Sequence, residues 1–214
     1  MSGFTTGVVP TARLLLLPLA VAHAEEMAAV LADPALHTFI GGSPADPAAL
    51  RARYARLVAG SPDPTESWCN WGIQLRDDSR LAGFVQATVT APLGPPRHAA
   101  TAGARANGHR HLDDTDRVDD GPVAEIAWVV GTAWQGRGIA TEAARGMTGW
   151  LGQRGVRTLV AHIHPDHLAS AAVATACGLS PTDTWHDGEV RWTGPATPPP
   201  EVDQGVRVGD DAKS

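Results

Sequence analysis

Apolar residues recur along the chain with two different periods, and each period predicts one type of element. Short apolar runs, typical of buried or half-buried strands, occupy residues 13–17, 68–75, 81–90, 123–130 and 156–163. Helical spacing of apolar residues is found in segments 20–31, 46–60, 137–154 and 166–177. Further strand residues follow at Leu179 and in segment 184–193.

The order of these elements predicts how they pair. Strands 68–75 and 81–90 are joined by a short polar segment, which predicts an antiparallel hairpin. From residue 123 to 177 the order is strand, helix, strand, helix, which predicts a parallel β-α-β unit. The first helix of this unit presents an apolar face made of Ile139, Ala143, Met147, Trp150 and Leu151. The expected fold class is therefore α/β (α+β).

Three segments lack such periodicity and are expected to lie outside the folded core. Residues 1–10 predict a flexible N-terminus, and residues 194–214, with three consecutive prolines, predict a disordered tail. Residues 91–121 are rich in Pro, Gly, His, Arg and Asp, which predicts a mobile insertion between two strands. We expect its His and Asp residues to form a solvated loop rather than a metal site. One domain, residues 11–193, remains.

Residues 13–24 allow two interpretations. One arginine, a short apolar run and an Ala-x-Ala ending have the outline of a secretory signal. However, Pro18 interrupts the run, the leading segment has a single basic residue, and the run is too short to span a bilayer. We therefore expect a buried first strand that turns at Pro18 into a helix.

Composition agrees with a single globular domain and argues against some functional classes. The 214 residues are 43% hydrophobic with a mean hydropathy of −0.12 and a formal charge of −6. Because no basic stripe is evident, we expect no nucleic-acid partner, and we expect no membrane partner. Cys69 and Cys177 lie far apart in the sequence, which favours neither a disulfide framework nor a zinc site. Both are expected to be structural thiols in a cytoplasmic protein.

The stretch 135–141, Gln-Gly-Arg-Gly-Ile-Ala-Thr, lies at the junction between predicted strand 123–130 and the helix that follows it. Two glycines at such a junction let successive backbone N–H groups converge on an anion at the positive end of the helix dipole. The expected ligand is a phosphate. The stretch lacks the Gly-Lys-Ser/Thr ending of a Walker loop and the third glycine of a dinucleotide fingerprint. A glycine-bearing turn without a ligand is the alternative.

This turn and its flanking segments resemble one known family. Gln135-x-x-Gly138-x-Ala140 is similar to the Arg/Gln-x-x-Gly-x-Gly/Ala acyl-CoA signature of the GNAT acyltransferase superfamily. The flanks resemble the branch that includes the ribosomal-protein alanine N-acetyltransferases. The similar segments are Thr11-x-Arg13-Leu14-x-Leu16-x-Pro18-Leu19, Trp71-Gly72-Ile73, Leu81-Ala82-Gly83-Phe84, Thr141-Glu142-Ala143 and Ser170 through Cys177-Gly178-Leu179. They occur in the family's order and cover residues 11–193.

The resemblance implies a GNAT fold, with a mixed central sheet that is splayed at the acyl-CoA site and flanked by helices. It implies acetyl-CoA as cosubstrate, with its thioester arm along one strand and its pyrophosphate on residues 135–141. Arg137 would meet a CoA phosphate or remain a solvated side chain, and His167 stands where the family usually has Asn. The implied cofactor-binding residues are Ile126, Val129, Val130, Gln135, Gly136, Arg137, Gly138, Ile139, Ala140, Thr141 and His167.

Transfer to an amine requires a base, because an alkyl amine is mostly protonated at neutral pH. Glu125 is the leading candidate, since it begins the strand that resembles the family's acyl-binding strand; a rim carboxylate that attracts a cationic substrate is the alternative. His162 and His164 share a face of the next strand and are rival bases or packed side chains. The general-acid Tyr of many relatives is missing, which leaves Ser170 or water to protonate the leaving group.

These inferences predict an enzyme that moves an acetyl group from acetyl-CoA to a primary amine by direct attack. The acceptor is expected to be a small-molecule amine or a protein or peptide N-terminus, and the acidic composition favours a cationic one. A catalytically silent CoA-binding regulatory or interaction module is the alternative, favoured by the missing Tyr and the replaced Asn. Use of a longer acyl-CoA is a third interpretation. The expected state is a monomer or homodimer.

Overall fold

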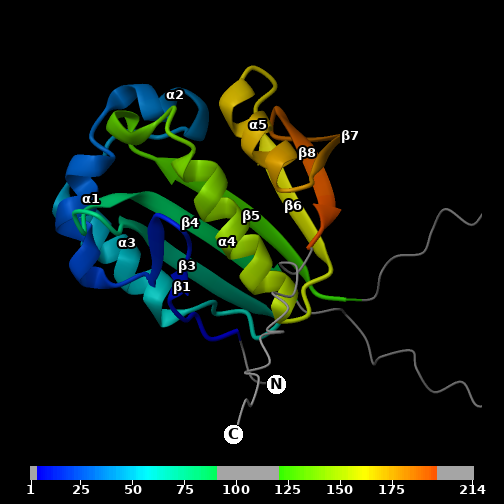
Figure 1. Ribbon diagram of the computed structural model, residues 1–214, viewed down its shortest axis with the longest axis horizontal. Helices are drawn as coiled ribbons and strands as arrows, with labels where there is room; N and C mark the ends of the chain where they lie inside the picture. Colours follow the sequence, from blue (N-terminus) through cyan, green and yellow to red (C-terminus); the bar gives the residue numbers. More distant parts are fainter. Residues whose placement is uncertain (1–3, 91–120, 197–214) are drawn as a thin grey trace, which may run out of the picture.

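The computed structural model describes residues 4–90 and 121–196 (Figure 1). Within these residues the strands form one eight-stranded sheet in the order β1-β2-β3-β4-β5-β6-β8-β7. The strands are β1 Val9–Pro10, β2 Leu14–Pro18, β3 Glu66–Leu75, β4 Leu81–Thr90, β5 Val123–Val130, β6 Thr158–Ile163, β7 Ser180–His186 and β8 Glu189–Pro195. The pairing of β5 with β6 is parallel and every other pairing is antiparallel. The sheet is therefore mixed, as expected.

Helices cover both faces of this sheet (Figure 1). They are α1 Ala24–Val30, α2 His37–Ile40, α3 Pro47–Ala59, α4 Ile139–Gln153 and α5 Leu168–Ala176, with 3₁₀ turns at Val21–His23, Pro34–Leu36 and Thr132–Trp134. Helices α1 and α3 pack together over β4 and β3, whereas α4 crosses β2, β4 and β5. Helix α5 lies beside α4 and β6. The five residues predicted for the apolar face of α4 are all buried.

The described part of the N-terminal segment contains a strand that its composition does not predict. Val9–Pro10 form β1, and the indole Nε1 of Trp71 donates a hydrogen bond to the carbonyl of Gly7 at 2.8 Å. The sequence patterns did not predict a strand within residues 1–10. The reason is tertiary, because Trp71 is fully buried in the sheet and its N–H needs a partner there.

Two further elements differ from the expectation. Helix α1 ends at Val30, close to the end of predicted segment 20–31, but the 3₁₀ turn Pro34–Leu36 and α2 follow it without a predicting pattern. The Asp33 carboxylate caps this turn by accepting a hydrogen bond from the N–H of Ala35. The late strand residues form a hairpin, β7 and β8, which extends to Pro195 and past the expected domain end at residue 193. The predicted insertion, 91–121, lies outside the described residues except for Gly121.

The sheet opens between β5 and β6. Within the described residues these two strands pair only where Val123, Ala124 and Glu125 face residues 158–160, although β5 continues to Val130 and β6 to Ile163. Beyond Glu125, the edge of β5 that faces β6 therefore has no strand partner among the described residues. Figure 1 shows the two strands diverging toward α2 and α5. The splayed mixed sheet is confirmed.

Gly83 allows β4 to approach the C-terminal end of β5 closely. A Cβ atom at this position would lie 2.0 Å from the carbonyl oxygen of Val129 and 2.9 Å from the Cα of Val130. Since both contacts are to backbone, no side-chain rotation relieves them. We expect Gly83→Ala to lower the free energy of unfolding by roughly 1–3 kcal/mol, measured by urea denaturation. Gly7→Ala is the control, because a Cβ there meets nothing within 4 Å.

No helix among the described residues is long and apolar enough to cross a membrane. In the same residues no group of three or more His, Cys, Asp or Glu side chains is arranged to hold a metal ion.

Candidate functional site

The site is built around the glycine turn, residues 135–141, which links β5 to α4. Gly136 has φ +71° and Gly138 has φ +73°, a left-handed conformation that favours glycine. Gly138 is the N-cap of α4, and no side chain caps the first amides of the helix. The Gln135 side chain donates from Nε2 to the carbonyl of Val130 at 3.0 Å, which ties the turn to the end of β5. Uncapped amides at a helix N-terminus suit an anion.

A groove of about 660 Å³ runs from this turn along the open edge of β5. Its walls are the C-terminal end of β5, the glycine turn, the start of α5 and the segment before α2. Apart from Ile126 and Arg137, every predicted cofactor-binding residue lines it: Val129, Val130, Gln135, Gly136, Gly138, Ile139, Ala140, Thr141 and His167. The Arg137 residue is exposed.

A second cavity of about 420 Å³ lies on the other side of the opening. It is bounded by β4, β5, β6, the first residue of β8 and segment 36–45, and both Glu125 and Ile126 line it. The two cavities share six lining residues: Leu36, Phe39, Trp128, Val129, His167 and Ser170. A ligand in the groove and a ligand in the second cavity would therefore meet beside Val129 and Ser170.

Glu125 and His162 form the polar pair of the second cavity. The Oε1 atom of Glu125 lies 3.3 Å from Nδ1 of His162, and the two side chains are 62% and 18% exposed. An ionised carboxylate only accepts hydrogen bonds, so Nδ1 of His162 must carry the hydrogen of this bond. In a neutral ring Nε2 then has a free lone pair. The structure thus joins two of the predicted base candidates into one pair.

His164 is engaged locally instead. Its Nδ1 accepts a hydrogen bond from the backbone N–H of Asp166 at 3.2 Å. It lines the second cavity but, unlike His162, has no bond to Glu125. Of the two rival histidines, His162 is therefore the one that the fold couples to Glu125.

His167 and Ser170 form the wall shared by the two cavities. As the N-cap of α5, His167 accepts at Nδ1 a hydrogen bond from the backbone N–H of Ser170 at 3.0 Å. Burial lowers the pKa of His167, so the ring is neutral at pH 7 and its hydrogen lies on Nε2. Phe39 packs edge-on against this ring, with a centroid distance of 4.3 Å. Sequence reasoning missed Phe39, because segment 34–40 is too short for a periodic signal.

Neither cysteine has the properties of a nucleophile. Burial raises the pKa of both Cys69 and Cys177 to about 11, so both thiols are protonated at neutral pH. Neither lines the groove or the second cavity. This favours direct transfer over a covalent acyl-cysteine intermediate.

Comparison with known families identifies the domain. The acetyltransferase (GNAT) domain family matches residues 13–180. The chain belongs to the GNAT acetyltransferase family. Enzymes of this family are acyltransferases that use acetyl-CoA and act on amine acceptors, and this chain is a GNAT acetyltransferase. Comparison with curated protein sequences finds no match.

Solved GNAT structures share the fold along nearly their whole length. A GNAT-family acetyltransferase from Bacillus anthracis has a TM-score of 0.61 at 14% identity, covering 89% of this chain and 99% of its own. An acetyltransferase from Agrobacterium tumefaciens str. C58 has a TM-score of 0.58 at 22% identity, covering 90% and 96%. RimL, a ribosomal L7/L12 alpha-N-protein acetyltransferase solved in complex with coenzyme A, has a TM-score of 0.59 at 14% identity, covering 88% and 97%. At these identities the likeness shows the GNAT fold alone.

Proposed function

We propose that this GNAT acetyltransferase transfers an acetyl group from acetyl-CoA to a primary amine by direct attack, with donor and acceptor meeting in the opening between β5 and β6. The observation that carries the proposal is the meeting of two cavities at Val129 and Ser170. One cavity ends at the glycine turn with its uncapped helix amides, and the other contains a carboxylate–imidazole pair. Acetyl-CoA, a phosphate-bearing thioester, needs the first environment. An amine nucleophile, which must lose a proton, needs the second.

The groove is the proposed donor site. Its left-handed glycines and uncapped helix amides suit the pyrophosphate of CoA, and Arg137 is the proposed side-chain partner of a phosphate. The edge of β5 beyond Glu125 offers backbone groups to the amide-containing arm of CoA, because no strand occupies this edge in the described chain. The proposed contact residues along this arm are Ile126, Val129 and Val130. His167 presents an Nε2–H donor on the same path.

The second cavity is the proposed acceptor site. It is lined by two carboxylate residues, Glu125 and Glu189, against one arginine, Arg53, and by the aromatic residues Phe39, Phe84 and Trp128. Carboxylates and aromatic faces both favour a cation next to an apolar body. We therefore propose a cationic primary amine, either a small molecule or a protein or peptide N-terminus, as the acceptor.

The chemistry requires one base and one acid. The ammonium form of the acceptor gives a proton to the Glu125–His162 pair, either directly to the carboxylate or to Nε2 of His162. The amine nitrogen then attacks the thioester carbonyl carbon, the C–S bond breaks, and the CoA sulfur leaves with the electron pair. The sulfur takes up a proton from water or from the Ser170 hydroxyl, which regains one from solvent. The amide nitrogen loses its extra proton to solvent, and the Glu125–His162 pair releases its proton to solvent before the next cycle.

An acceptor screen tests this proposal. The full chain is incubated with acetyl-CoA and a panel of small primary amines and short peptides, and thiol release is followed together with calorimetric binding of CoA. We expect turnover with at least one cationic amine. Binding of CoA without turnover on any acceptor would favour the silent CoA-binding module instead. Repeating the screen with longer acyl-CoA donors measures the acyl preference.

A further inference from the structure

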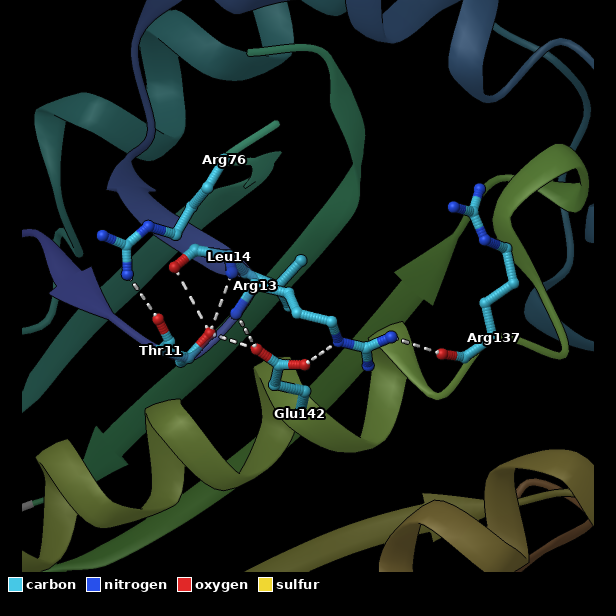
Figure 2. A network of polar contacts seen from close by, with 6 residues as sticks. All are labelled: Thr11, Arg13, Leu14, Arg76, Arg137 and Glu142. Carbon is cyan, nitrogen blue, oxygen red and sulfur yellow. Dashed lines mark hydrogen bonds and ion pairs between the residues drawn. The ribbon is translucent and has the colours of Figure 1, made fainter. Parts of the chain in front are cut away.

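A polar network connects the N-terminal turn, residues 11–13, to the first turn of α4 (Figure 2). The carboxylate of Glu142 accepts hydrogen bonds from Thr11 Oγ1 at 2.6 Å, from the backbone N–H of Arg13 at 2.7 Å and from Arg13 Nε at 2.6 Å. The Glu142 side chain is only 17% exposed. Desolvation raises its pKa, but the hydrogen bonds from Thr11 and Arg13 and the charge of Arg13 outweigh this effect and hold the pKa below its usual value. Glu142 is therefore a fixed anion at neutral pH.

Arg13 also reaches the glycine turn directly. Its Nη1 donates a hydrogen bond to the backbone carbonyl of Arg137 at 3.0 Å. Figure 2 shows the guanidinium lying between the Glu142 carboxylate on one side and this carbonyl on the other. Because the guanidinium is planar and rigid, anchoring one edge on Glu142 fixes where the other edge points.

This contact determines the orientation of the peptide unit between Arg137 and Gly138. In a trans peptide the C=O and the following N–H point in opposite directions within one plane. Since the Arg137 carbonyl faces Arg13, the Gly138 N–H faces away from it. Gly138 lines the groove, whereas Arg13 does not. The hydrogen bond from Arg13 thus fixes the direction of the Gly138 N–H, on the side of the peptide unit away from Arg13.

We infer that Arg13 is a positioning residue for acyl-CoA binding, which presents the Gly138 N–H to the pyrophosphate before the ligand arrives. This inference rests on the proposed assignment of the groove to CoA. A glycine with φ +73° flanked by further turn residues has many accessible conformations, so a fixed peptide plane reduces the entropy lost on binding. Arg13 acts through the backbone and needs no contact with the acetyl group or the acceptor.

Arg76 provides a matched control for a purely structural role. Its Nη1 donates to the carbonyl of Thr11 at 2.8 Å, so it stabilises the same N-terminal turn. In Figure 2 it approaches this turn from the side opposite Glu142. Its hydrogen bond ends on Thr11, not on the glycine turn. Removing Arg76 therefore loosens the N-terminal turn without freeing the Arg137–Gly138 peptide.

Calorimetric titration of the full chain with CoA tests the inference. We expect Arg13→Met to weaken CoA binding roughly tenfold and Arg76→Met to weaken it less than about twofold, at comparable losses of thermal stability. Arg13→Lys keeps the charge but lacks the planar fork, so it should weaken binding as Arg13→Met does. Full affinity in Arg13→Lys, or equal losses in the Met variants of Arg13 and Arg76, would overturn the positioning role.

A second titration uses 3′-dephospho-CoA, which keeps the pyrophosphate. The same fold loss in Arg13→Met is expected with this probe, and a loss seen only with CoA would mean that Arg13 contacts the 3′-phosphate instead. Binding by the unchanged chain without turnover in the acceptor screen would contradict the proposed catalysis and leave the positioning role standing. Absence of CoA binding by the unchanged chain would overturn both.

Discussion

Gly138→Asp is expected to lower the affinity for CoA by at least about 100-fold, the largest binding effect of any single change in the groove. A carboxylate at the N-cap of α4 would take the amide donors that the pyrophosphate is proposed to use, and its negative charge would repel the phosphates. The fold should tolerate the change. A Cβ at this position has only one neighbour within 4 Å, Arg13 Nη2 at 3.5 Å, and Asp is among the residues that adopt a left-handed conformation most readily.

Two control variants separate charge from conformation. Gly138→Asn introduces a side chain of the same shape without the charge and should retain more affinity than Gly138→Asp. Gly155→Asp places the same charge on a glycine with φ +86° and open surroundings just beyond the other end of α4. It should cost stability without changing CoA affinity. Unchanged affinity in Gly138→Asp, measured by calorimetry with CoA, would remove the pyrophosphate from the glycine turn.

Glu125→Gln is expected to reduce kcat by roughly 10²-fold or more while leaving CoA affinity unchanged. The amide cannot accept the proton of the ammonium, and it no longer provides the charge that stabilises a protonated His162 beside it. If Glu125 is only a rim carboxylate, the same change raises the KM of the acceptor and spares kcat. Steady-state kinetics as a function of pH distinguishes the two roles, and an unaltered pH–rate profile would remove Glu125 from the mechanism.

Glu189→Gln and His162→Gln complete this experiment. Glu189 lines the same cavity but is not bonded to His162 among the described residues, so its replacement should affect acceptor KM more than kcat. If Glu125 and His162 act as one base, the double variant Glu125→Gln/His162→Gln should have a kcat only slightly below that of either single variant. Additive losses would instead indicate two separate roles.

Local sequence patterns determined most of the fold of this chain. The hairpin β3–β4, the parallel unit of β5, α4 and β6, and the buried face of α4 follow from apolar periodicity over neighbouring residues. The glycine turn could also be predicted, since its residues are consecutive and the glycines are needed for its positive φ values. Periodicity fails for short elements, which is why β1, α2 and the turn between β7 and β8 were missed.

Only the tertiary structure decided which distant side chains meet. Glu125 and His162 are 37 residues apart, and they form a pair because the parallel ladder that aligns β5 with β6 ends beside Glu125. Arg13 and Glu142 are separated by 129 residues, and their contact depends on how α4 crosses β2. A sequence pattern reports on neighbours along the chain, whereas these contacts depend on strand order and helix docking. The sequence by itself thus predicted a phosphate-binding turn, and the packing of the whole sheet decided which side chains contact that turn and which histidine pairs with Glu125.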